Sequence, residues 1–90
     1  PLCFHPGVIG SLAESAGQFA ALTILPADSS LVTTEYKLNL LAAAQGNMLI
    51  VHAKIVKSGK TMTVCTSEIY ARRDRYQYLC GMALMTFVSE

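Results

Sequence analysis

Glu14 is the side chain with the clearest capacity for chemistry in this sequence. It is the only charged residue between Gly7 and Pro26, in a stretch that is otherwise mostly apolar. Burying an unpaired carboxylate is costly, and a positioned carboxylate can act as a general base or a nucleophile. Alternatively, Glu14 belongs to a polar stripe that simply faces water, and periodicity alone favours this interpretation. At helical spacing the stripe comprises Ser11, Glu14, Ser15 and Gln18.

A second candidate is the start of the same segment, His5-Pro6-Gly7. Proline suits the first turn of a helix, where its missing N–H would lack an intrahelical partner anyway. The sequence therefore predicts a helix start with an imidazole and free backbone N–H groups at the positive end of the helix dipole. Such a site suits a developing oxyanion. Taken alone, a histidine here is more often a cap. Cys3 lies near His5, but we expect neither a Cys–His nucleophile pair nor a metal site.

The element that positions these residues is a helix predicted from Val8 to Leu25 and ended by Pro26. Little of its surface is polar, so we expect it to be mostly buried. The apolar residues at near-helical spacing are Val8, Leu12, Ala16, Phe19, Ala20 and Ile24, and the stripe is widened by Ile9, Ala13, Ala21, Leu22 and Leu25.

Four β-strands are predicted to follow the helix, joined by short links. The first alternates, with Val32, Tyr36 and Leu38 on one face and Thr33 on the other. A helix followed by consecutive strands predicts one α+β domain over residues 1–90, an antiparallel meander packed on the helix. The predicted strands are Leu31–Leu41, Met48–Lys57, Thr61–Ala71 and Tyr76–Val88.

The composition of the chain indicates which kinds of binding partner to expect. Apolar residues make up 52% of the 90 and charged residues only 14%, which is apolar for so small a chain. The longest low-charge run contains Glu14, so we expect an oligomer rather than a membrane span. A net charge of +1 gives no electrostatic case for nucleic acid. Three cysteines without a C-x-x-C motif indicate a reducing, cytoplasmic location.

Three stretches of the chain resemble motifs of a known family. His5 to Glu14 is similar to H-G-G-x-x-x-x-L-x-D/E, Thr33 to Leu41 to T-x-E-x-K-I-N-F-L, and Val56 to Thr61 to V-x-x-G-K/R-T. These motifs characterise hot-dog-fold thioesterases of the phenylacetate-degradation (PaaI-like) and 4-hydroxybenzoyl-CoA thioesterase branch. Their order agrees, and the resemblance covers nearly the whole chain. It implies a hot-dog fold, in which an antiparallel sheet wraps one long central helix.

The resemblance also implies hydrolysis of an acyl-CoA and a role for each matching residue. Glu14 matches the acidic residue that acts as nucleophile or general base on the thioester carbonyl. Gly7 matches the glycine whose N–H polarises that carbonyl, and His5 matches the histidine that shapes the same turn. Thr33 falls near a hydroxyl residue that helps to place the attacking water. The coenzyme A contacts match the segment from Leu41 to Ala44 and the hairpin residues Lys57, Ser58, Gly59, Lys60 and Thr61.

The chain departs from the family pattern in three places. Pro6 replaces the first glycine and removes one N–H from the turn. Ala42-Ala43 stands where many members have Arg-Pro, which removes one possible contact to the nucleotide. The family's first helix and strand would lie upstream of Pro1, so we expect the family's N-terminal segment, with its substrate-orienting Asn or Gln, to be missing.

Seven residues separate Gly7 from Glu14, about 10 Å along one helix, which is too far for both to reach one carbonyl comfortably. We therefore expect a site shared between subunits of a homodimer or dimer of dimers, with no metal and no cofactor beyond the coenzyme A of the substrate. The alternative is a non-catalytic acyl-CoA or ligand-binding protein of the same fold. The acyl group, aryl or short to medium chain, stays open, with expected wall residues Phe19, Tyr36, Met48, Met62 and Tyr76.

Overall fold

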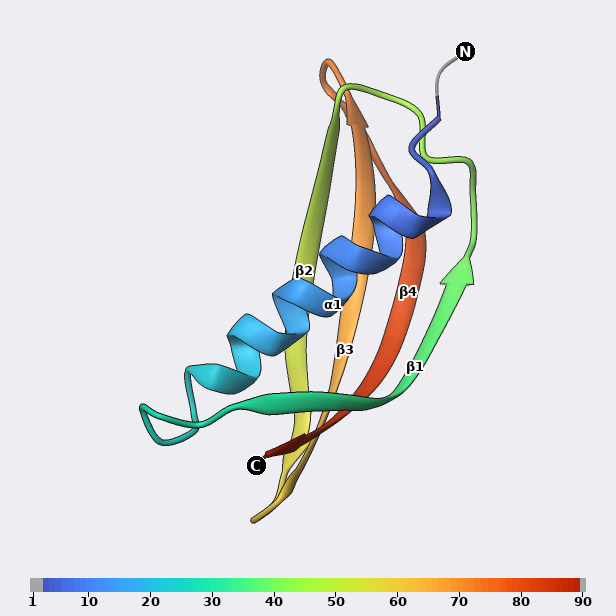
Figure 1. Ribbon diagram of the computed structural model, residues 1–90. Coiled ribbons are helices and arrows are strands. Elements are labelled where there is room, and N and C mark those ends of the chain that lie inside the picture. Colours follow the sequence, from blue (N-terminus) through green and yellow to red (C-terminus); the bar gives the residue numbers. More distant parts are fainter. Residues whose placement is uncertain (1–2, 90) are drawn as a thin grey trace.

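A computed structural model describes residues 3–89 and shows one helix lying across one face of a four-stranded antiparallel sheet (Figure 1). This confirms the predicted fold class. The predicted element boundaries hold to within three residues, the helix ending at Leu22 rather than Leu25. The elements are α1 Pro6–Leu22, β1 Leu31–Leu40, β2 Met48–Ser58, β3 Met62–Arg73 and β4 Tyr76–Ser89.

The predicted meander is wrong for β1. The strand order is β1-β4-β3-β2, so β1 pairs with β4 and not with its sequence neighbour β2. The connection 41–47 is too long for a tight hairpin and instead crosses the ends of the two central strands, as Figure 1 shows. Along the way Leu41 N–H donates to the Cys80 carbonyl at 2.9 Å, and Asn47 N–H donates to the Arg72 carbonyl at 3.1 Å. Strands β1 and β2 are therefore the two edges of the sheet.

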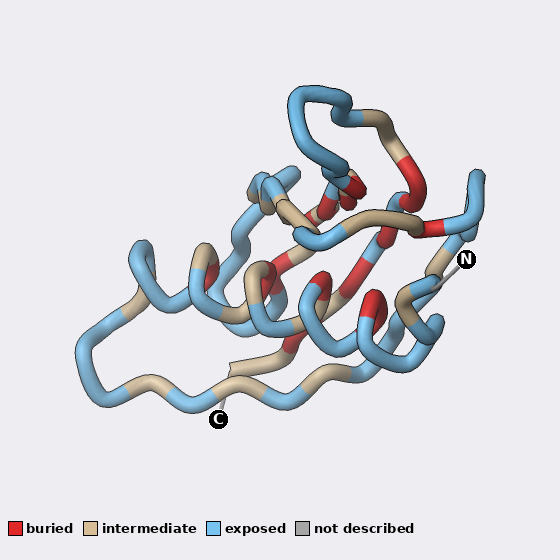
Figure 2. Tube along the Cα trace, turned by 90° about the horizontal axis from the view of Figure 1, so that it is seen from above, coloured by how far each residue is buried: buried red, intermediate tan, exposed pale blue. Residues whose placement is uncertain are grey.

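The helix buries only part of the predicted apolar surface, the side that carries mostly small residues, and leaves the larger residues of the stripe exposed. Figure 2 shows buried residues at the side of α1 that faces the sheet. Val8, Leu12 and Phe19 of the predicted stripe are exposed, Phe19 to 71%. Mostly small side chains lie at this contact because they let the sheet approach the helix closely. The buried helix residues are Ile9, Gly10, Ala13, Gly17 and Ala21.

The opposing layer of the core comes from the central strands. The large, fully buried side chains of this layer include Cys65, Ile69, Met85 and Phe87. Two buried polar residues lie on β3, Thr63 and Ser67, and the Ser67 hydroxyl donates to the Ala13 carbonyl of α1 at 3.0 Å. This bond satisfies Ser67 and links the middle of the helix to β3.

A β-bulge in β1 changes which residues face the helix. Thr33 pairs with Phe87 and Glu35 pairs with Thr86, so Thr34 is an extra residue in the ladder. After the bulge the alternation is reversed, and Tyr36 pairs with the buried Met85. Thr33, Tyr36 and Leu38 consequently all face α1, although strict alternation predicted Thr33 on the opposite face.

Candidate active site

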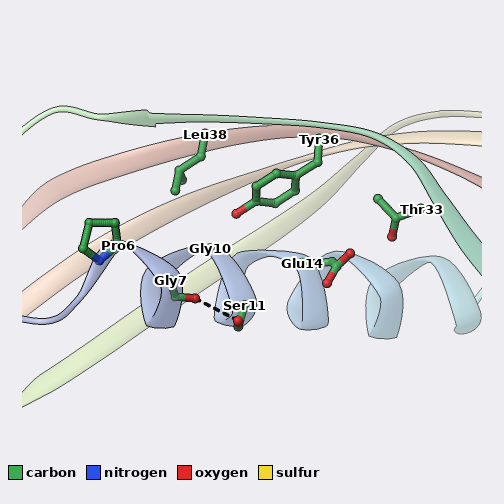
Figure 3. A pocket seen from close by; sticks show the side chains of 8 residues that line it. All are labelled: Pro6, Gly7, Gly10, Ser11, Glu14, Thr33, Tyr36 and Leu38. Atoms are coloured by element: carbon green, nitrogen blue, oxygen red, sulfur yellow. Dashed lines mark hydrogen bonds between the residues drawn. The ribbon is translucent and has the colours of Figure 1, made fainter.

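An open depression of about 570 Å³ lies between α1 and β1 (Figure 3). The helix contributes one wall and the helix-facing side chains of β1 contribute the other. Glu14, Gly7 and Thr33, which were singled out from the sequence, all border it. Its lining consists of Pro6, Gly7, Gly10, Ser11, Glu14, Thr33, Tyr36 and Leu38.

Glu14 is half-buried and borders this depression. The four residues of the polar stripe therefore differ in burial. Glu14 and Gln18 are half-buried on the β1 side, whereas Ser11 and Ser15 are exposed. The water-facing interpretation fits Ser15, whereas Ser11 and Glu14 both border the depression, because β1 passes along that edge of the helix.

Thr33 is held in place by a residue whose role the sequence did not reveal. Gln18 Nε2 donates to Thr33 Oγ1 at 3.2 Å, which leaves the Thr33 hydroxyl proton free to bond another group. In Figure 3 the Thr33 hydroxyl and the Glu14 carboxylate point toward the same part of the depression. The sequence places Gln18 one helical turn after Glu14, and this spacing could have predicted that the two side chains lie on the same side of the helix.

The helix start differs from the prediction of free N–H groups. His5 is the N-cap, and its Nδ1 accepts a hydrogen bond from Gly7 N–H at 2.9 Å. The N–H groups of Val8 and Ile9 both donate to the His5 carbonyl, at 2.9 Å and 3.2 Å. Proline at position 6 has no N–H. Every first-turn donor of residues 6–9 is therefore already bonded, and Gly7 N–H must exchange its partner before it can bind a carbonyl.

Tyr36 reaches from β1 across the depression toward the helix. Its hydroxyl lies against Gly10, where a Cβ would collide with the phenolic oxygen. Glycine at position 10 is therefore what makes room for the phenol. Burial and, secondarily, the negative charge of Glu14 raise the pKa of the Tyr36 hydroxyl, so the phenol stays protonated at neutral pH. Of the five expected wall residues, Tyr36 alone borders this depression.

The predicted coenzyme A contacts fall into two separate places. Residues 41–44 line a neighbouring depression of about 420 Å³, together with Phe4, Pro6 and Ile9 beside the helix start. The hairpin Lys57–Thr61 lies at the other end of the sheet, where Gly59 N–H donates to the Met62 carbonyl at 2.7 Å (Figure 1). No residue of this hairpin lines the depression that Glu14 borders.

Other kinds of site find no support in residues 3–89. No group of three or more His, Cys, Asp and Glu side chains in that range could hold a metal ion. Cys65 and Cys80 are buried, and burial raises the pKa of both thiols, which disfavours the reactive thiolate. No helix within these residues is long and apolar enough to cross a membrane.

A profile of the thioesterase superfamily matches residues 4–77 of the chain. A search of curated protein sequences finds no match. Among solved structures, a thioesterase family protein from Silicibacter pomeroyi is similar with a TM-score of 0.93 at 30% identity, covering 97% of this chain and 64% of that chain.

Two further structures share the fold at lower identity. A Bacillus halodurans protein determined with CoA has a TM-score of 0.91 at 24% identity, covering 98% of this chain and 60% of that chain. A phenylacetic acid degradation-related protein from Ralstonia eutropha has a TM-score of 0.83 at 20% identity, covering 96% of this chain and 62% of that chain. The chain thus spans less than two thirds of each relative. The profile match and the shared architecture show that this chain belongs to the thioesterase superfamily and has the hot-dog fold.

Proposed function

We propose that this protein hydrolyses an acyl-CoA thioester, with Glu14 as the nucleophile or general base. The observation that carries the proposal is the half-buried Glu14 carboxylate, which faces the α1–β1 depression beside the Thr33 hydroxyl. A carboxylate aimed into a depression, next to a hydroxyl oriented by Gln18, is suited to hold and deprotonate a water molecule. Membership of the thioesterase superfamily supports the same chemistry.

The site is proposed to be completed by a second subunit. Gly7 and Glu14 stand two helical turns apart, and the Lys57–Thr61 hairpin lies at the far end of the sheet from Gly7. A partner chain would supply the Gly7 N–H, turned away from His5, and the hairpin that contacts coenzyme A. The exposed apolar side chains and the two unpaired sheet edges are what such a partner would cover.

The substrate is proposed to carry an aryl or a short to medium alkyl group. The part of the depression lined by Pro6 and Leu38 and the neighbouring depression around Phe4 and Ile9 are apolar and suit either group. The second candidate, a non-catalytic acyl-CoA binder, is favoured by the bonded state of Gly7 N–H, which leaves that donor unavailable in the present arrangement.

Glu14→Gln tests the proposal. Thiol release from a panel of benzoyl-, phenylacetyl-, butyryl- and octanoyl-CoA is measured in a Cys3→Ser background, so that the exposed Cys3 does not react with the thiol reagent. Turnover of the best substrate should fall at least about a hundredfold, while its affinity stays within about threefold. Ser15→Ala, an exposed change on the same helix, is the matched control and should retain full turnover. If the folded Glu14→Gln protein is fully active, Glu14 has no catalytic role. If the parent chain binds the acyl-CoA but does not hydrolyse it, the second candidate is favoured.

A further inference from the structure

We propose that the Tyr36 hydroxyl donates a hydrogen bond to the thioester oxygen in the same site, and from the same chain, as Glu14. The inference rests on the proposed function and adds a residue that the family motifs do not mark. Three observations carry it: the reach of Tyr36 across the depression, the space that Gly10 leaves for its hydroxyl, and the hydrogen bonds of the other lining groups.

The first step is an inventory of donors in the depression. Gly7 N–H donates to His5 Nδ1, and Ser11 Oγ donates to the Gly7 carbonyl at 2.8 Å. The Thr33 hydroxyl, which accepts from Gln18 Nε2, keeps a free proton on the Glu14 side of the depression. Among the eight residues drawn in Figure 3, the Ser11–Gly7 bond is the only hydrogen bond, and Tyr36 takes no part in it. The protonated phenol is therefore a donor that faces the depression with its proton uncommitted.

The second step is the placement of the phenol relative to the carboxylate. The Tyr36 hydroxyl lies against Gly10, one helical turn before Glu14. Residues four apart on a helix are separated by roughly 5–6 Å, which leaves room for one carbonyl group between them. A thioester lying along the depression would turn its carbonyl oxygen to Tyr36 and its carbonyl carbon to Glu14 or to a water held by Glu14 and Thr33.

The third step is the reaction itself. In the general-base route Glu14 takes one proton from water while the water oxygen bonds to the carbonyl carbon. The carbonyl π pair moves to oxygen, and the resulting oxyanion accepts the hydrogen bond from Tyr36, which keeps its proton. When the carbonyl re-forms, the carbon–sulfur bond breaks and the thiolate leaves with the bonding pair, taking up the proton held by Glu14. If Glu14 attacks directly, an oxyanion forms on the same carbonyl oxygen, and its collapse breaks the carbon–sulfur bond, expels the thiolate and leaves an anhydride between Glu14 and the acyl group. Water then opens the anhydride to give the free acid and the Glu14 carboxylate, and the thiolate takes up the released proton.

Tyr36→Phe separates this role from simple packing. The variant keeps the ring and removes only the hydroxyl, so a spacer against Gly10 would be preserved. We expect kcat to fall about a hundredfold, the scale for losing one oxyanion donor, with KM changed less than about threefold and the melting temperature unchanged. Tyr70→Phe, which removes a hydroxyl that is bonded to Glu68 and does not line the depression, is the matched control and should keep full activity.

Gly10→Ala provides a second, independent readout. The added methyl group would displace the phenol, so kcat should fall in the parent chain. In the Tyr36→Phe background the hydroxyl is already absent, so the same change should lower kcat little further. Equal losses in both backgrounds would show that Gly10 acts independently of the hydroxyl and would overturn the proposal.

Mixing Glu14→Gln with Tyr36→Phe protomers tests whether the two residues serve one site. If they do, each heterodimer carries one lesion in each site, and no fully active site forms. If they serve different sites, half of the dimers carry one intact site, and activity returns to about a quarter of the parent value. The second result, with exchange verified by mass spectrometry, would overturn the same-chain assignment. If the parent protein and the Tyr36→Phe variant hydrolyse the substrate equally fast, only the role of Tyr36 is overturned. If the parent protein releases no thiol, the proposed function is overturned as well.

Discussion

The His5 side chain controls the state of the helix start. Its ring nitrogen and its carbonyl oxygen together accept all the N–H donors of the first turn of α1. Nδ1 can accept the Gly7 N–H only when it carries no proton, so the cap requires the neutral ring. The same contact that stabilises the helix therefore competes with the binding of a carbonyl at Gly7.

The contribution of the His5 cap to the free energy of unfolding can be measured. His5→Ala removes the acceptor of Gly7 N–H and should lower the free energy of unfolding by about 1 kcal/mol, the usual scale for losing an N-cap. His5→Asn should retain most of that stability, because asparagine is among the best N-cap residues. Urea unfolding of the three proteins gives the comparison. Equal losses in both variants would show that the imidazole stabilises the turn through something other than the cap.

At the scale of elements, the connection 41–47 decides the order of the strands. It carries the chain from one edge of the sheet to the other over the ends of β4 and β3. Gln45 N–H donates to the Tyr78 hydroxyl at 2.9 Å, which fixes the connection to β4. Gly46 has φ 141°, and a Cβ there would collide with the Arg72 carbonyl of β3. Only glycine combines this backbone conformation with so close an approach.

Gly46→Ala should accordingly destabilise the protein by at least about 2 kcal/mol, because both the backbone and the neighbouring strand would have to shift. Gly59→Ala is the control, since the nearest atom to its added methyl group, the Met62 carbonyl oxygen, would be 3.4 Å away. That variant should change the free energy of unfolding by less than about 1 kcal/mol. Similar denaturation midpoints for the two variants would mean that the connection can relax without cost.

At the scale of the whole molecule, one chain leaves much of its apolar surface uncovered. Phe19, Val56 and Tyr76 are exposed to 71%, 60% and 69%, and the edge strands β1 and β2 each have one unpaired side. Patches of this kind are uncommon on stable monomers and are covered by a second subunit or by a further segment of the same protein. The proposed shared site requires the same association.

Sedimentation equilibrium at micromolar concentration should therefore give a mass of at least twice the 9.7 kDa of one chain. The association should be insensitive to salt, because the exposed groups that drive it are apolar rather than charged. A soluble, stable monomer across the concentration series would contradict both the oligomer and the shared site.

The reactivity of the three cysteine thiols measures how well the core is closed to solvent. Cys3 is exposed, whereas Cys65 and Cys80 are buried, and burial raises the pKa of both. A thiol reagent at neutral pH should modify one thiol per native chain rapidly and all three after unfolding in urea. Cys3→Ser should abolish the rapid phase. A second rapid thiol in the native protein would show that the core opens more readily than its packing indicates.

The sequence by itself determined the local elements and the candidate residues. The proline at position 6, the alternating strands and the turn glycines are short-range signals, and they placed each element end to within three residues. The family motifs singled out Glu14, Gly7 and Thr33, which the structure brings to one depression. Their catalytic roles stay predictions.

Tertiary structure alone decided how these parts meet. Alternation shows that a strand has two faces but not which strand lies beside it, so the pairing of β1 with β4 could not be read from the chain. The bulge at Thr34 turned Thr33 and Tyr36 to one side, and close packing against the sheet selected the small-residue face of α1 over the larger apolar one. Periodicity encodes local geometry, whereas register, neighbour and buried face depend on contacts between residues far apart in the sequence.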